Sequence, residues 1–428
     1  MRVRPTRRRV ALALAAAVAM TLAVSACSPD AHVEIDVPAQ VDAPFPEATA
    51  QQLQDAVSHA MVAAGASGAV VGVWAPWSGS LVTGLGVTSP ATGEAVTPDM
   101  EFRVGQITRP MICDVLYALA DEGTVQLDDS LTKWVTGLPD LSEVTLGQLC
   151  DSTSGLGSYR PQLAPLFLSN PTRVWNPREL ASYGIGQPRD AAPGAAYRDS
   201  DAGYLLLGVA LERATGRSAA SLLEHYVFDP LDLAATRLPS NSAAEPSESG
   251  PVLNGFHSLP DAAGAFNCAE PLDVTMFSAS SGFTDSGVVS DIRDLGRYVQ
   301  GLAADAIVPE GAGRFDQPVA VYNGAPSWYT TRGGAVQAGS LIGQFGAVPG
   351  YITAAFSDPQ SGLTVAVAMN NSAGDKGMAA YLAWELAAIA SKAPAADGAT
   401  APAAGLPWTA QQYHDTIAAS AICSAPAA

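Results

Sequence analysis

The chain has 428 residues, of which 48% are hydrophobic and only 15% are charged, so it can bury a large core. Its formal net charge at pH 7 is -19. We therefore expect neither nucleic acid nor an anionic membrane surface as a direct partner. The chain contains no Cys-x-x-Cys pattern, Walker loop or dinucleotide glycine pattern, so no cofactor is expected. The histidines are scattered and indicate no metal site: His32, His59, His225, His257 and His414.

Residues 1–26 resemble the signal peptide of a bacterial lipoprotein. Five arginines lie between Arg2 and Arg9 and precede an apolar stretch, Val10 to Val24, that is short for a membrane-spanning helix. The small residues that follow lead directly into Cys27, as in a lipobox. The resemblance implies that Cys27 is acylated and anchors the protein at the outer face of the cell membrane. Loss of the five arginines changes the net charge to -24 (17 basic against 41 acidic residues). An ordinary signal peptide, with Cys27 incidental, is the alternative.

Residues 27–48 contain prolines, alanines and acids without periodicity, which is typical of a tether. Helical spacing follows over residues 51–64. A β-rich run at 67–75, a turn at 77–80 and a second strand at 81–87 come next.

Helical patterns dominate residues 107–230, and strand patterns return late in the chain. The strands are expected at 335–341, 351–356 and 362–369, and a final helix at 376–391. This order predicts one α/β (α+β) domain over 49–391, in which helices flank an antiparallel sheet and an all-α lobe is inserted. Residues 392–428 are predicted to be an alanine- and proline-rich linker and a short tail, which docks back if Cys423 is bridged.

Six sequence blocks resemble the serine β-lactamase and DD-peptidase superfamily, in particular its class C, esterase and D-aminopeptidase branch. They occur in the family's order and at its spacing, over about residues 50–391. The resemblance implies a β-lactamase/transpeptidase-like fold. The blocks are Phe102–Arg109, Asp121–Asp129, Thr145–Leu156, Pro193–Gly208, Gly287–Leu295 and Gly346–Tyr351.

Four cysteines remain besides Cys27, and in an oxidising compartment an even number suggests two disulfides with three pairings. In the family fold the helices that carry Cys113 and Cys150 pack together. The resemblance therefore implies a Cys113–Cys150 bridge and leaves Cys268 for Cys423. Two buried free thiols at 113 and 150 are the alternative.

The catalytic positions of the family are substituted in this sequence. Family members attack an acyl carbonyl with a serine, helped by a lysine three residues later and a tyrosine of a second motif. These positions hold Gln106, Arg109 and Asp199. A carboxamide has no nucleophilic oxygen, and a guanidinium does not give up its proton in a protein. The resemblance also aligns Asp201 with the second motif and Gln344 with the third. Across the three motifs only Gly346 is retained. No catalytic residue is therefore assigned.

The substituted residues should converge in a cleft if the fold holds. Arg109 paired with Asp199 would be either a structural ion pair filling a former active site or part of a binding cleft. In the second case Gln106, Asp201 and Gln344 would contact a peptidoglycan-type peptide or glycan, or an envelope protein. The surplus carboxylate would suit a cationic ligand group.

A working serine hydrolase with an unconventional nucleophile is the alternative function. The hydroxyls near the motifs belong to Thr108, Ser152 and Ser200. Thr108 would point away from the cleft, and Ser152 is expected in a helix cap or turn. None of the three motif segments contains a histidine that would complete another hydrolytic triad.

Overall fold

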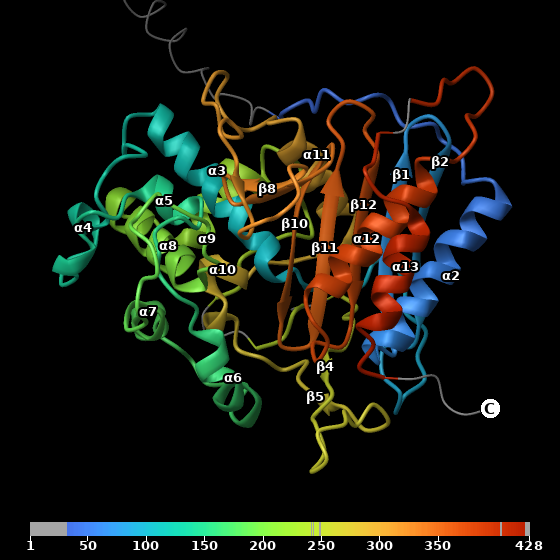
Figure 1. Cartoon of the computed structure of the whole chain (residues 1–428), viewed down its shortest axis with the longest axis horizontal. Helices are drawn as coiled ribbons and strands as arrows, with labels where there is room; N and C mark the ends of the chain where they lie inside the picture. Colours follow the sequence, from blue (N-terminus) through green and yellow to red (C-terminus); the bar gives the residue numbers. More distant parts are fainter. Residues whose placement is uncertain (1–31, 241, 243, 248–249, 403–404, 424–428) are drawn as a thin grey trace, which may run out of the picture. The chain divides into compact units, whose positions relative to one another are not determined.

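The computed structural model describes residues 32–240, 242, 244–247, 250–402 and 405–423 (Figure 1). The predicted signal peptide and Cys27 lie outside these residues. Within the described part of the chain, no helix is both long and apolar enough to cross a membrane. The architecture below is that of the unit that begins at Val33.

An eight-stranded antiparallel sheet forms the centre of this unit, in the order β2-β1-β12-β11-β10-β9-β8-β7. The N-terminal hairpin joins the C-terminal strands because β1 pairs with β12, where Ala69 lies opposite Met369. The strands are β1 (Gly68–Ala75), β2 (Gly79–Gly86), β7 (Val319–Ala320), β8 (Tyr329–Arg332), β9 (Ala335–Ala338), β10 (Leu341–Val348), β11 (Tyr351–Ser357) and β12 (Thr364–Met369).

Helices cover both faces of the sheet, because side chains alternate along each strand. On β1, Ala69 and Val71 join one hydrophobic core, whereas Val70 between them joins the other. The first core lies under α2 (Glu47–Ala64), α12 (Gly377–Ala390) and α13 (Ala410–Ala419), which Figure 1 shows side by side. The second core contains α11 (Ile292–Ala303) and the helical lobe.

The helical lobe is inserted between β2 and β7 and forms the left part of Figure 1. Its two ends meet where β3 (Phe102–Arg103) pairs with β6 (Val289–Ser290). A second short pair joins β4 (Phe256–His257) to β5 (Leu272–Asp273). The lobe's helices are α3 (Thr108–Asp121), α4 (Leu131–Trp134), α5 (Leu146–Cys150), α6 (Arg160–Ser169), α7 (Pro177–Ile185), α8 (Asp201–Thr215), α9 (Ala219–Leu223) and α10 (Phe283–Ser286).

The predicted fold class is confirmed, but one strand prediction is wrong. Residues 335–341 form two strands, since β9 ends at Ala338 and β10 begins at Leu341. Gly339 has φ +59° and turns the chain between them, a conformation that favours glycine. Gly339 and Ser340 between two strand-like runs are a hairpin signal that the prediction overlooked.

Residues 33–46 of the predicted tether contact the domain instead of standing free of it. Val33 donates its backbone N–H to the Pro230 carbonyl at 2.9 Å, and the Phe45 side chain is buried in the core under α2. Helix α2 begins at Glu47, earlier than expected. The buried aromatic ring explains why this proline-rich segment is held against the surface.

The C-terminal tail docks on the domain, as expected for a bridged Cys423. The disulfide joins Cys423 to Cys268, and the Trp408 indole donates to the Trp384 carbonyl at 3.0 Å. Tyr413 and Ile417 of α13 are buried in the core formed with α2 and α12. The tail is therefore part of the layer that covers the sheet.

Candidate functional site

Gln106 lies in a single 3-10 turn, Gly105–Ile107, that leads from β3 into α3. The side chain is 3% exposed, and its Oε1 accepts a hydrogen bond from the backbone N–H of Ala347 on β10. A Cβ at Gly346 would lie 1.8 Å from this oxygen, so only glycine permits the close approach. Gln106 thus fills the space between the start of α3 and β10.

Arg109 stands on the first turn of α3 and binds two carboxylates. Its Nη1 lies 2.6 Å from Asp199 Oδ1, and its Nε lies 2.8 Å from Asp285 Oδ1. The guanidinium carbon also lies 4.7 Å from the centre of the Tyr204 ring. The predicted Arg109–Asp199 pair is therefore present, with Asp285 as a second partner that the sequence analysis missed.

The two carboxylates extend these contacts into a row of alternating charges, which we call the ion-pair chain. At one end, Lys376 binds the second oxygen of Asp199. At the other end, Arg160 Nη2 lies 2.6 Å from Asp285 Oδ2, and Arg160 Nε lies 3.5 Å from Asp201 Oδ2. Three cations therefore face three carboxylates. The sequence predicted a surplus of negative charge in the cleft, and this prediction is wrong.

Opposite charges hold the central members of the chain ionised. Although burial opposes ionisation, Arg109 and Lys376 lower the pKa of Asp199 well below its usual range. Arg109 and Arg160 likewise lower the pKa of the fully buried Asp285. The same carboxylates outweigh burial and raise the pKa of Arg109 well above its ordinary value. Arg109 is therefore a permanent cation and has no lone pair with which to accept a proton.

Asp201 does not contact Arg109 and lies at the buried end of the ion-pair chain. It begins helix α8, and its carboxylate accepts hydrogen bonds from the Ser158 hydroxyl and, at 2.8 Å, from the Tyr159 backbone N–H. Burial and the charge of Asp285 raise the pKa of Asp201 to about 6. This carboxyl therefore changes charge near neutral pH.

Gln344 lies two residues before Gly346 on β10, on the strand face that meets Gln106, and it lines a cavity together with Arg109 and Asp199. Its Nε2 donates to the Gly334 carbonyl at 2.8 Å, and its Oε1 accepts from the Phe345 N–H at 2.9 Å. These two hydrogen bonds occupy the amide. Gln344 is left as part of a cavity wall.

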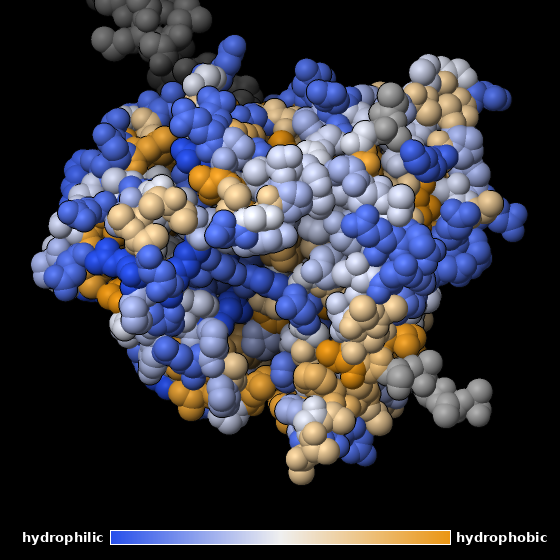
Figure 2. Space-filling model, in the orientation of Figure 1, coloured by the Kyte–Doolittle hydropathy of each residue, from blue (hydrophilic) through white to orange (hydrophobic). Residues whose placement is uncertain are grey.

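Two cavities share Arg109, Asp199 and Lys376 in their walls. The first cavity, of about 340 Å³, has the ion-pair chain on one side and apolar α6 residues, including Phe167 and Leu168, on the other. The second, of about 460 Å³, has mainly aromatic walls. Figure 2 shows hydrophilic residues gathered in the hollow between the helical lobe and the sheet. The aromatic residues of the second cavity are Tyr197, Tyr322, Trp328, Tyr329, Phe345, Tyr381, Trp384 and Tyr413.

The family model for Beta-lactamase matches residues 53–388, most of the chain. The chain belongs to the Beta-lactamase family. It is 25% identical over 275 residues to penicillin-binding protein 4* of Bacillus subtilis (strain 168), covering 59% of this chain and 56% of that protein. It is also 30% identical over 161 residues to the D-alanyl-D-alanine-carboxypeptidase/endopeptidase AmpH of Escherichia coli (strain K12), covering 35% of this chain and 40% of that protein. The matches thus span about half the length of these relatives.

Solved structures of other proteins share the fold. A D-stereospecific amidohydrolase from Streptomyces sp. superposes with a TM-score of 0.66 and 25% sequence identity, covering 79% of this chain and 98% of that chain. A D-amino acid amidase from Ochrobactrum anthropi SV3 superposes with a TM-score of 0.62 and 21% identity, covering 77% of this chain and 92% of that chain. The predicted resemblance is confirmed for both the family and the fold.

The hydroxyls considered as alternative nucleophiles all form hydrogen bonds within this Beta-lactamase-family domain. Ser200 caps α8 by accepting the Gly203 N–H at 3.1 Å. Ser152 donates to the Tyr204 hydroxyl at 3.1 Å, and Thr108 donates to the Gly105 carbonyl at 2.8 Å. All three side chains are buried.

One serine–histidine pair lies in the first cavity and was missed in the sequence. Ser372 Oγ lies 3.0 Å from His257 Nδ1, and both residues line the cavity. Ser372 also accepts the backbone N–H of Gly350 at 2.9 Å. Burial lowers the pKa of His257, so its imidazole is neutral at pH 7. The two residues lie outside the family motifs and are far apart in sequence, so only the fold brings them together.

Three further members of the ion-pair chain were also missed: Arg160, Asp285 and Lys376. Asp285 had a detectable signal, because it is the only charged residue in the stretch 274–290. A lone acid in an uncharged, largely buried segment requires a cationic partner. Arg160 and Lys376 lie at the starts of α6 and α12 and have no comparable signal.

Proposed function

We propose that this protein binds an envelope ligand in its cleft without forming an acyl-enzyme. The main supporting observation is that Gln106 and Arg109 hold the nucleophile and base positions while both are engaged in contacts with the fold. Gln106 provides no hydroxyl, and Arg109 is held between two carboxylates. The ion-pair chain then serves as a polar wall for a ligand instead of a proton relay.

The backbone at the cleft supports the same proposal. Acyl transfer needs backbone N–H groups directed at the developing oxyanion. The Ala347 N–H, beside the former nucleophile position, instead donates to the Gln106 side chain. A tetrahedral intermediate could bind this donor only after Gln106 had moved out of its buried position.

We further propose that the ligand is a peptide with D-amino acids, of the kind found in peptidoglycan. The names of the relatives include carboxypeptidase and amidase activities on D-amino-acid substrates. The first cavity offers an apolar wall for a small side chain and, at its rim, the partly exposed pair of Lys376 and Asp199 for a terminal carboxylate or amine. Lipidation of Cys27 would hold this cleft at the outer face of the membrane.

The direct test is covalent labelling of the purified protein with a fluorescent penicillin and with an activated ester, followed by intact mass analysis. We expect no stable adduct. A muropeptide that ends in D-alanine should raise the midpoint of thermal unfolding, and Lys376→Met should weaken that effect. Lys133→Met is the matched control, because Lys133 forms a surface pair with Asp129 away from both cavities. An acyl adduct on any serine would contradict the proposal.

A second candidate function is hydrolysis by Ser372 with His257 as base. The 3.0 Å contact between Oγ and Nδ1 inside the first cavity is the observation that favours it. In that case the adduct should map to Ser372 and disappear in Ser372→Ala, while Ser200→Ala should still label. Labelling that survives Ser372→Ala would exclude this nucleophile.

The proposed anchor is tested independently of the cleft. Cells that express the protein are supplied with a labelled fatty acid, and we expect the label on the wild-type protein but not on Cys27→Ser. The Cys27→Ser protein should also leave the membrane fraction. Membrane retention without label would instead support an ordinary signal peptide and attachment of another kind.

A further inference from the structure

Three side chains of types that commonly bind metal ions meet on the helical layer that contains the C-terminal tail. They are His59 on α2, Glu385 on α12 and His414 on α13, and one ligand atom of each lies within 4.8 Å of the other two. His414 Nδ1 lies 3.0 Å from Glu385 Oε1. The imidazole rings of His59 and His414 stack, with centroids 3.8 Å apart. None of the three residues lines either cavity of the cleft.

Two polar atoms of this group are buried without a hydrogen-bond partner, His59 Nδ1 and Glu385 Oε2. The Glu385 residue is only 3% exposed, so water does not replace the missing partner of its carboxylate. A buried polar atom without a partner is costly, and such atoms in folded proteins call for an explanation. A cation between the three side chains would satisfy both of them.

The donor set fits a divalent transition metal. Two imidazole nitrogens and one carboxylate oxygen are a common set for zinc, and a water molecule completes the tetrahedron. His59 Nδ1 has no hydrogen-bond partner, so this nitrogen is available as a ligand. The His414 side chain is 39% exposed, which leaves room for a water ligand on the solvent side.

We propose that His59, Glu385 and His414 form a zinc-type metal site that fastens the C-terminal helix to α2 and α12. The stacked rings do not direct both lone pairs at one point, so binding must tilt one ring. His414 is the ring that can turn, because it lies at the exposed edge of the group. Its neighbour Tyr413 lines the second cavity, so the metal would also fix part of that wall.

The test uses the purified full-length protein without a histidine tag, oxidised and dialysed against a chelator. Zn²⁺ is titrated by calorimetry and Co²⁺ by visible absorption. We expect one ion per chain and the intense ligand-field bands of four-coordinate Co²⁺. Zn²⁺ should also raise the thermal midpoint, because it binds the folded state.

Variants then assign the site. His59→Gln and His414→Gln should each weaken Zn²⁺ binding by more than about 100-fold, because loss of a direct ligand should exceed the effect of losing an outer-sphere partner. His225→Gln, an exposed histidine away from this group, is the matched control and should bind as the wild type does. If His59→Gln does not fold, His414→Gln and the wild-type Co²⁺ spectrum still test the proposed metal site. Absence of stoichiometric binding, or binding that survives His414→Gln, would overturn the site and leave a hydrogen-bonded His–Glu cluster.

Discussion

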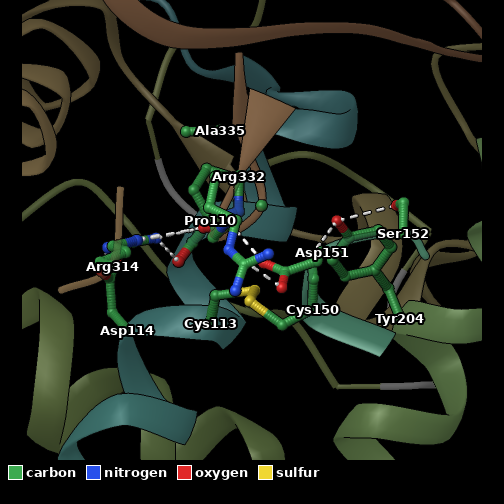
Figure 3. Close-up of a disulfide and its surroundings, with 12 residues drawn as sticks. Pro110, Cys113, Asp114, Cys150, Asp151, Ser152, Tyr204, Arg314, Arg332 and Ala335 are labelled. Carbon is green, nitrogen blue, oxygen red and sulfur yellow. Dashed lines mark hydrogen bonds and ion pairs between the residues drawn. A yellow bond between two sulfur atoms is a disulfide. The ribbon is translucent and has the colours of Figure 1, made fainter. Parts of the chain in front are cut away.

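Helix α3 contributes to two regions of arginine–aspartate ion pairs, and these regions differ in their exposure to solvent. Near its start, Arg109 binds Asp199 and Asp285, and the Asp199 side chain is 40% exposed in the cleft. One turn later, Asp114 binds Arg314, whose side chain is 0% exposed. Figure 3 shows Arg314 and Asp114 next to the Cys113–Cys150 disulfide.

In the region around Arg314 and Asp114, which we call the sealed region, the polar partners all belong to the fold. Arg314 donates to the carbonyl of Pro110 at 2.9 Å and to that of Gly333 at 2.7 Å, and Asp114 accepts from the Tyr298 hydroxyl at 2.8 Å. In the cleft, the outer members Lys376, Asp199 and Arg160 remain partly exposed. We therefore read the first region as structural and the second as available to a ligand, because only the second can exchange a protein contact for a ligand contact.

Asp114→Ala should have the largest effect on stability. It leaves the Arg314 cation buried without its counter-ion, and loss of one partner of a buried pair costs about 3–5 kcal/mol of unfolding free energy. Denaturant unfolding measures this value. Lys133→Met, which breaks the surface pair with Asp129, should cost about 1 kcal/mol or less. Equal losses in the two variants would contradict the distinction between sealed and exposed pairs.

Removal of the Cys113–Cys150 disulfide should come next. The predicted pairing is confirmed, and it closes a loop over a sequence separation of 37 beside the sealed region. Cys113→Ala with Cys150→Ala should lower the free energy of unfolding by about 2–4 kcal/mol. Non-reducing peptide mapping of the wild type should find both bridges. Ligand binding should persist in the folded double variant; its loss would show that the bridge also shapes the cleft.

The pH dependence of stability should show the titration of Asp201. Its pKa is about 6 in the folded state and 3.8 in the unfolded state, so the folded protein binds more protons between these values. This contribution to stability is fully present below pH 4 and is lost as pH rises through 6. Asp199 and Asp285 act in the opposite sense, since their pKa values are lowered and their contributions are lost as pH falls.

Asp201→Asn should reduce the fall in stability between about pH 4 and 6, as measured by thermal unfolding across that range. Asp294→Asn is a useful comparison, because burial also raises the pKa of Asp294, outside the cleft. A wild-type profile unchanged by Asp201→Asn would place the titrating group elsewhere.

Lys376→Met should have the smallest effect on stability. Both Lys376 and Asp199 are partly exposed, so solvent screens their attraction, and we expect a change of about 1 kcal/mol or less. Ligand affinity should nevertheless fall, because the ammonium lies on the wall of both cavities. A large loss of stability without loss of ligand binding would reverse the roles assigned to the two regions.

Much of the fold and part of the site were predictable from sequence, because both leave local patterns. The β-rich run around Val70 and the helical spacing before it predicted the first strand and α2, and the motif blocks predicted the family. The motif order also placed Gln106 and Arg109 beside Asp199. The turn at Gly339 was missed, although Gly339-Ser340 between two strand-like runs is a local signal for a two-residue hairpin.

Only the tertiary structure decided which charges and histidines meet. Arg160 and Lys376 join the ion-pair chain because core packing brings together helix starts from distant parts of the chain. For the same reason His59 and His414, scattered in the sequence, stack on each other. Local patterns record the burial and periodicity of each segment, whereas the partners of a polar group depend on contacts between segments that no local pattern records.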